Sequence, residues 1–124
     1  MKKQSYRDLL AWQRAMDLVD EIYSTVRNFP NYEMFALATQ MRKAATSIPC
    51  NIAEGQGRFS LRDFRHFLRE ARASALELET EIIIANRQGY FDSERAEKLL
   101  EQASRVGQLI NGLIRHISKR IQGE

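Results

Sequence analysis

The fold of this chain is decided by the stretch from residue 47 to residue 58, which reads Ser47-Ile48-Pro49-Cys50-Asn51-Ile52-Ala53-Glu54-Gly55-Gln56-Gly57-Arg58. This stretch places a proline inside a segment that otherwise has the pattern of an amphipathic helix. Pro49 has no backbone N–H, and in a helix its ring clashes with the carbonyl of Ala45. We therefore predict a helix that is kinked at Pro49 and that needs polar groups nearby to satisfy the freed backbone.

The polar residues after the proline allow two interpretations. Asn51 and Glu54 could line a ligand site in which burial raises the pKa of the carboxyl. Alternatively they hydrogen-bond the backbone that the kink and the helix end leave unpaired, and we favour this structural role. Gly55 and Gly57 are predicted to form the C-cap. Cys50 is expected to be buried beside the kink and chemically inert.

Apolar residues recur at three- and four-residue spacing over four segments, which is typical of amphipathic helices. The segments run from about residue 8 to 28, 33 to 54, 61 to 88 and 92 to 121. Pro30 ends the first, and Ser60 and Gly89 bound the third as N-cap and stop signal. The sequence lacks the alternation of apolar and polar residues that is typical of strands. The sequence therefore predicts an all-α protein, an antiparallel up-down-up-down four-helix bundle with a proline kink in helix 2, in one domain over residues 1–124.

Each segment contributes one apolar stripe to the predicted core. The stripe of the first segment consists of Trp12, Ala15, Met16, Val19, Ile22, Tyr23 and Val26. The stripe of the second consists of Phe35 or Leu37, followed by Ala38, Met41, Ala45, Ile48 and Ile52. The stripe of the third consists of Phe64, Phe67, Leu68, Ala71, Ala75, Leu78, Ile82 and Ala85, and the stripe of the fourth continues to Ile121.

Composition excludes several protein classes. A single cysteine rules out an intrachain disulfide and fits a reducing compartment. No apolar run approaches the roughly 18–20 residues that span a bilayer, and the first eight residues contain no apolar signal region. We therefore expect a cytoplasmic protein that makes no membrane contact. The net charge of +3 is too small to identify a partner by itself.

Five arginines repeat at spacings of four and three along the third segment: Arg58, Arg62, Arg65, Arg69 and Arg72. At about 100° per residue they occupy one narrow arc of the helix. They could be an ordinary solvated face that keeps the protein soluble. They could also be a phosphate-binding stripe, because the planar guanidinium group matches phosphate geometry.

The distribution of charge along the chain supports the second interpretation. Residues 58–72 carry a balance of +3, residues 73–101 a balance of −4, and residues 102–124 a balance of +3. In an antiparallel bundle the start of the third helix lies beside the end of the fourth. The basic residues near the end of the fourth segment are Arg115, Lys119 and Arg120. Lys2, Lys3 and Arg7 are expected at the same end, so the bundle should have one basic and one acidic end.

The third segment also carries apolar residues away from its core stripe. They are Leu76, Ile83 and Ile84, to which Leu10, Phe59 and Leu109 can be added. Isolated exposed apolar residues are normal on soluble proteins. A contact between subunits at Leu76, Ile83 and Ile84 is the alternative.

Residues typical of catalytic sites are missing. A di-metal site in a bundle needs two Glu-x-x-His pairs, and the only approximation is Asp63-Phe64-Arg65-His66. His116 has no acid three residues before it, and Gly55-Gln56-Gly57 is too short for a phosphate loop. We therefore expect a protein that is not an enzyme, with no metal, no cofactor and no small-molecule substrate.

Several motifs resemble one known family. The most specific is Ile48-Pro49-Cys50-Asn51-Ile52-Ala53-Glu54-Gly55, and others are Tyr6-Arg7-Asp8-Leu9-Leu10-Ala11-Trp12 and Ala85-Asn86-Arg87-Gln88-Gly89-Tyr90. Together they make the chain similar to the four-helix-bundle family of 23S rRNA intervening-sequence proteins. It departs from the family pattern at Cys50, Gln56 and Ala36. The resemblance implies a ring-shaped homo-oligomer, a pentamer, and a distant likeness to the basic pentameric accessory proteins of diversity-generating retroelements. It therefore favours a subunit interface at Leu76, Ile83 and Ile84 over isolated exposed residues. It implies no defined biochemical activity.

Two functions from different classes follow. The first is a non-enzymatic oligomeric bundle that binds the backbone of RNA or DNA, or a nucleoprotein, through its clustered arginines and lysines. The second is a structural or protein-interaction scaffold without a nucleic-acid role, which uses the ring itself as a platform.

Overall fold

The computed structural model describes residues 5–123 and consists of helices and short links. The four long helices are α1 (Leu10–Val26), α2 (Leu37–Gln56), α3 (Leu61–Arg87) and α4 (Ser93–Gln122). Short 3-10 turns, Tyr6–Asp8 and Asn31–Glu33, precede α1 and α2. These turns start the first two helices later than predicted. Residues 5–123 contain no strand, so the all-α prediction is confirmed.

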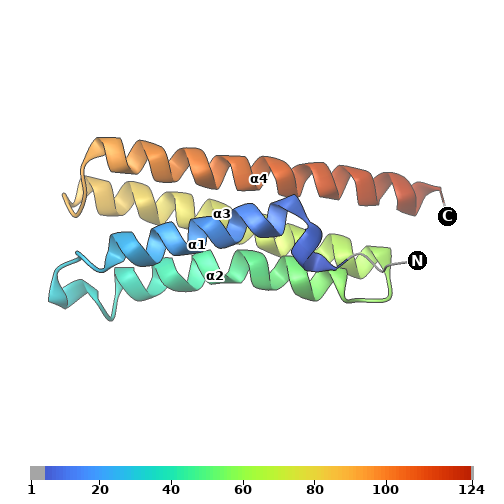
Figure 1. Cartoon of the computed structure of the whole chain (residues 1–124), viewed down its shortest axis with the longest axis horizontal. Coiled ribbons are helices and arrows are strands. Elements are labelled where there is room, and N and C mark those ends of the chain that lie inside the picture. Colours follow the sequence, from blue (N-terminus) through green and yellow to red (C-terminus); the bar gives the residue numbers. More distant parts are fainter. Residues whose placement is uncertain (1–4, 124) are drawn as a thin grey trace.

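The four helices lie side by side, consistent with a four-helix bundle (Figure 1). Helix α1 packs against α2 and α4, and α3 packs against the same two helices. In Figure 1 the α1–α2 and α3–α4 links lie at the left, whereas the α2–α3 link and the end of α4 lie at the right. At about 1.5 Å per residue, the 27 residues of α3 extend about 40 Å. None of the helices within residues 5–123 is both long and apolar enough to cross a bilayer.

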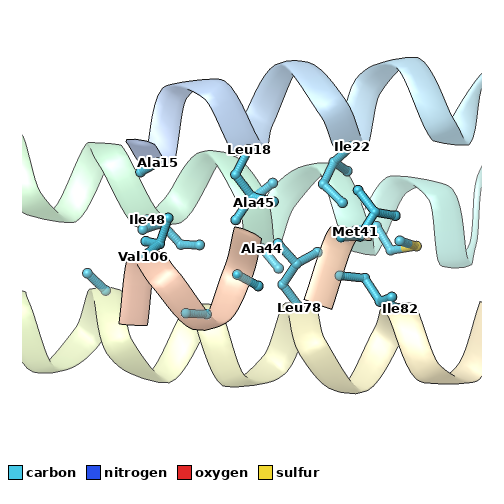
Figure 2. Close-up of a cluster of buried hydrophobic side chains, with 14 of the residues drawn as sticks. Ala15, Leu18, Ile22, Met41, Ala44, Ala45, Ile48, Leu78, Ile82 and Val106 are labelled. Atoms are coloured by element: carbon cyan, nitrogen blue, oxygen red, sulfur yellow. The ribbon is translucent and has the colours of Figure 1, made fainter. Parts of the chain in front are cut away.

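All four helices contribute to one apolar core, which Figure 2 shows near its centre. In Figure 2 Leu18 and Ile22 from α1 lie near Ala45 and Met41 from α2, and Leu78 from α3 points toward the same region. Side chains of this kind stabilise a protein by about 1.5–3 kcal/mol each when fully buried. Small residues, above all alanines, separate the larger ones and let the helices approach one another.

The predicted stripe of α1 is partly wrong. Leu18 is fully buried although the predicted stripe does not include it, whereas Met16 and Tyr23 are 37% and 39% exposed. Both sides of α1 carry apolar residues, and contact with α2 and α4 selects the side that includes Leu18. In α2 the ambiguity between Phe35 and Leu37 is resolved in favour of Leu37, because Phe35 is 95% exposed.

Helix α2 continues through Pro49, which is buried. The predicted bend at this residue stays a prediction. Asn51 Nδ2 donates hydrogen bonds of 2.9 Å to the backbone oxygen and to Oγ of Ser47, one turn earlier. The expectation of a buried Cys50 is wrong, since the cysteine is exposed. Because Pro49 faces the core, the next residue is rotated by about 100° toward solvent.

The two glycines of α2 have different roles. Gly57 occupies the C-cap position, and its N–H donates to the Ala53 oxygen. Gly55 lies inside the helix instead of capping it, which corrects the prediction. A Cβ at Gly55 would lie only 2.7 Å from Cβ of Phe67 on α3. The absence of a side chain at Gly55 therefore allows the close approach of α2 and α3.

Caps hold the ends of α3. Ser60 Oγ accepts a hydrogen bond from the N–H of Asp63, as predicted for an N-cap. At the other end Gly89 has φ +80°, a left-handed conformation that glycine adopts without strain. The N–H groups of Gly89 and Tyr90 donate to the oxygens of Asn86 and Ala85. This is a Schellman motif, and it turns the chain toward α4.

Candidate nucleic-acid interface

Basic residues from two distant segments of the chain gather at one end of the bundle. Arg58, from the α2–α3 link, and Arg120, near the end of α4, line the same pocket. Arg65 Nη1 donates to Ser118 Oγ at 3.3 Å, which joins the first part of α3 to the last part of α4. We call this surface the basic end; it comprises Arg58, Arg62, Arg65, Arg115, Lys119 and Arg120.

The arginine stripe of α3 borders its seam with α4. Arg62 and Arg69 are exposed, and neither has a hydrogen-bond or ion-pair partner within residues 5–123. Arg65 is half-buried, and Arg72 Nη1 lies 3.5 Å from Asn111 Oδ1 on α4. Arg62 and Arg69 are thus the members of the stripe whose guanidinium groups are free for an external anion.

Arg58 is held more firmly than the other arginines of the basic end. Its Nη2 lies 2.8 Å from Glu54 Oε1, and its guanidinium carbon lies 4.8 Å from the centre of the Phe67 ring. Both members of the ion pair are about half exposed, so the pair contributes little to stability. Its effect is to orient the guanidinium. Glu54 is exposed, so the partly buried carboxylate that the ligand-site interpretation required is not observed.

The end of α4 adds more positive charge. Arg115, Lys119 and Arg120 are all exposed. Arg7, in the first 3-10 turn, is exposed as well, and its guanidinium carbon lies 5.5 Å from the centre of the Tyr6 ring. Lys2 and Lys3, expected at this end, lie outside the described residues.

Side chains at the opposite end of the bundle pair with one another. Arg95 Nη2 lies 2.9 Å from Glu21 Oε2 and 2.8 Å from Thr25 Oγ1. Tyr90 donates from its hydroxyl to Glu33 Oε2 at 2.7 Å, and this hydrogen bond raises the pKa of Tyr90. Since about 40 Å separates the ends and the Debye length is about 8 Å at physiological salt, the two surfaces act as independent electrostatic regions.

The residues predicted as a subunit interface are exposed in the single chain. Leu76, Ile83 and Ile84 show 58%, 47% and 43% of their surface. Leu76 also lines a groove of about 370 Å³ between α3 and α4, together with Glu79 and Gln108. Leu109, expected to be surplus to the core like these residues, is half-buried against it, which corrects that expectation.

Metal-binding residues do not cluster in the described part of the chain. Asp63 and His66 are both exposed on α3, and the His66 ring packs edge-on against Phe67. No group of three or more His, Cys, Asp or Glu side chains in residues 5–123 could hold a metal ion.

Sequence reasoning missed two features near the predicted sites. Glu81 is buried on α3 with 5% exposure, although its residue type gives no signal of burial. Phe59 is fully exposed in the α2–α3 link, next to Arg58, whereas the sequence identifies it only as a surplus apolar residue. Its position in a short polar link beside an arginine is the signal that could have identified it.

Comparison with known proteins identifies similar chains. A family model described as "23S rRNA-intervening sequence protein" matches residues 7–112. The fold is similar to the crystal structure of a protein of unknown function from the S23 ribosomal protein family of Bacteroides thetaiotaomicron. The TM-score is 0.77 at 23% sequence identity, over 85% of this chain and 98% of that chain. Identity at that level shows a shared fold. None of the curated proteins compared with this chain matches it.

Proposed function

The chain belongs to the family of 23S rRNA-intervening sequence proteins, and we propose that it is a non-enzymatic, oligomeric helical bundle that binds RNA or DNA through its basic end. The ligand is the sugar-phosphate backbone, either free or within a nucleoprotein. Contacts to phosphate position a protein without reading base sequence, so binding of this kind is weakly sequence-specific. The site of action is the cytoplasm.

One observation carries the proposal: two cationic segments that lie far apart in the sequence meet at one end of the bundle. Arg58 and Arg120 share a pocket, and Arg65 contacts Ser118. The up-down-up-down order of the helices accounts for this meeting. The exposed guanidinium groups of Arg62 and Arg69 supply the donors that phosphate oxygens accept.

Assembly multiplies the basic surface. Leu76, Ile83 and Ile84 form an exposed apolar strip along α3, and covering this strip with a second copy removes it from water. The assembly is a closed ring, a pentamer by family resemblance. In a ring with cyclic symmetry every basic end points in the same direction, so the local positive charge grows with the number of subunits.

A binding titration tests the nucleic-acid role. Fluorescence anisotropy with labelled RNA and DNA should show an affinity that falls steeply as salt rises, because counterions are released from the neutralised phosphates. The triple variant Arg62→Glu/Arg65→Glu/Arg69→Glu should abolish binding at about 100 mM salt. Because Arg65 is half-buried, the double variant Arg62→Glu/Arg69→Glu is measured alongside, and it should weaken binding at least about tenfold.

A charge-matched control shows whether a loss of affinity comes from the changed arginines themselves or from the lower net charge of the protein. The variant Arg27→Glu/Lys43→Glu/Arg87→Glu changes the net charge equally but alters exposed residues outside the basic end. It should retain most of the affinity. Equal loss of affinity in both triple variants contradicts the proposal, and so does undiminished binding in the variants that change Arg62 and Arg69. If the wild-type protein assembles but binds neither RNA nor DNA, the result supports the alternative function, a protein-interaction scaffold.

The apolar strip on α3 leads to a separate prediction about oligomer assembly. Leu76→Asp/Ile83→Asp should dissociate the oligomer, because it places two charges in the interface. Light scattering coupled to size exclusion at micromolar concentration measures the mass. The control Met16→Asp/Tyr23→Asp changes two exposed residues with the same spacing on α1 and should leave the assembly intact. A monomeric wild-type protein would refute the interface.

A further inference from the structure

The pocket at the basic end combines features that a phosphate contact alone does not need. It has a volume of about 370 Å³, near the lower limit of small-molecule pockets. Its lining includes the cations Arg58 and Arg120 and the apolar side chains of Phe59, Leu61 and Phe64. A pocket lined by both cations and apolar side chains fits a ligand that combines the same two features, a phosphate joined to a flat aromatic base.

Phe59 is the unusual member of this set. Its side chain is fully exposed although the described residues contain a well-packed apolar core. A phenylalanine in a link makes no contribution to the core, and its open ring face is available for stacking. Every nucleobase presents such a face once it is unpaired, whereas bases inside a duplex are already stacked on their neighbours.

The cations of the pocket are arranged for a phosphate. Glu54 and the Phe67 ring hold the Arg58 guanidinium in place, and its ion pair with Glu54 uses one of its terminal nitrogens. A guanidinium has five N–H donors, so others stay available. Arg120 is exposed and has no ion-pair partner within the described residues. Both arginines lie in the same pocket as Phe59, so one nucleotide can contact all three.

From this arrangement we infer that the pocket binds one unpaired nucleotide of a single strand, with the base stacked on Phe59 and the phosphate held by Arg58 and Arg120. This inference rests on the proposed function and adds a strand preference to it. Single strands bind more tightly than duplexes of the same length. Stacking tolerates any base, so the preference is for an unpaired strand and not for a sequence.

The experiment compares three labelled 12-mers by anisotropy: a single strand of uridines, a duplex of the same length, and an abasic single strand with the same number of phosphates. Wild-type protein should bind the uridine strand about tenfold more tightly than the abasic strand. Phe59→Ala should remove this difference by weakening binding to the uridine strand alone. Phe59→Trp should restore it. Arg120→Ala should weaken binding to the uridine and abasic strands alike.

Phe35→Ala is the matched control, because Phe35 is 95% exposed in the link at the opposite end of the bundle. It should change none of the affinities. Equal affinity of wild type for uridine and abasic strands overturns the inference, while loss of binding in the Arg62→Glu/Arg69→Glu variant still supports the proposed function. If no strand binds at all, both fail. If Phe59→Ala instead dissociates the oligomer in light scattering, Phe59 is a contact between subunits and the inference is wrong.

Discussion

Glu81 is the residue whose environment differs most from what its chemistry favours. Only 5% of its surface is exposed, and its Oε1 has no hydrogen-bond partner in residues 5–123. Burial, with a smaller effect from the charge of Glu77, raises the pKa of Glu81 to about 7. In the unfolded chain the same carboxyl titrates near 4.5. Between these pH values the folded protein holds a proton that the unfolded chain has released.

Stability should therefore depend on pH through this one side chain. The free energy of unfolding should fall as pH rises from about 4.5 through 7, by about 1–3 kcal/mol, because ionising a buried carboxyl is costly. Glu81→Gln has the shape of the neutral acid and should remove this loss. Urea unfolding at fixed protein concentration, at about pH 5.5 and about pH 8.5, measures the difference. If wild type and Glu81→Gln show the same pH dependence, the raised pKa is wrong.

The burial of Glu81 could not be predicted from its residue type. Carboxylates are almost never fully buried unless they are paired, so a charged residue next to a core stripe is normally assigned to the surface. The neighbouring carboxylates fit this expectation, since Glu77 is exposed and Glu79 is half-exposed. What decides the difference is the position of the neighbouring helices, which the spacing along α3 does not specify.

Among the elements, the contact between α2 and α3 places the tightest constraint on the sequence. Cβ of Phe67 lies only 2.7 Å from the position that a Cβ at Gly55 would take. Across the same pair of helices, Ser47 Oγ lies 2.8 Å from Ser74 Oγ. Small residues of α2, including Ala44 and Ala45, are buried. The pair therefore fixes the position of the α2–α3 link, and with it the place of Arg58 and Phe59.

Gly55→Ala should disrupt this contact. The new Cβ would meet Phe67 Cβ at 2.7 Å and the Phe64 oxygen at 3.2 Å, so the helices must separate, at a cost of about 1–3 kcal/mol. Gly107→Ala on α4 is the control, since a Cβ added at Gly107 would have no neighbouring atom within 4 Å. That change should stabilise the protein by about 0.5–1 kcal/mol. Equal effects of the two substitutions in urea unfolding contradict the packing of α2 against α3.

The helices also show how well the spacing of apolar residues predicts which side chains are buried. In α3 the predicted core positions from Leu68 to Ala85 are buried, because their three- and four-residue spacing marks one continuous face of the helix, whereas Leu76, Ile83 and Ile84 lie off that face and are exposed. In α1 apolar residues stand on two sides, so the spacing predicts Met16 where Leu18 is buried. The meeting of the two basic segments follows from the predicted order of the helices. The partners Ser118 and Asn111 do not, because they depend on the register between α3 and α4.

At the scale of the whole molecule, the separation of charge along the bundle is the basis of the proposed function. The basic end presents exposed cations from α3 and α4, whereas Arg95 at the other end is paired with Glu21. A polarised bundle in a ring presents one strongly positive side, which attracts polyanions at long range and loses this attraction as salt screens it. If the two basic segments form one binding surface, both must contribute to the affinity for nucleic acid.

The most direct test of this claim is the slope of log Kd against log salt for single-stranded RNA, measured for wild type and for one variant in each segment. We predict a steep slope for wild type, and a slope reduced by roughly one to two units both in Arg62→Glu/Arg69→Glu and in Lys119→Glu/Arg120→Glu, because each pair gives up about two phosphate contacts. A flat slope for wild type, or an unchanged slope in the α4 variant, would contradict a binding surface shared by the two segments.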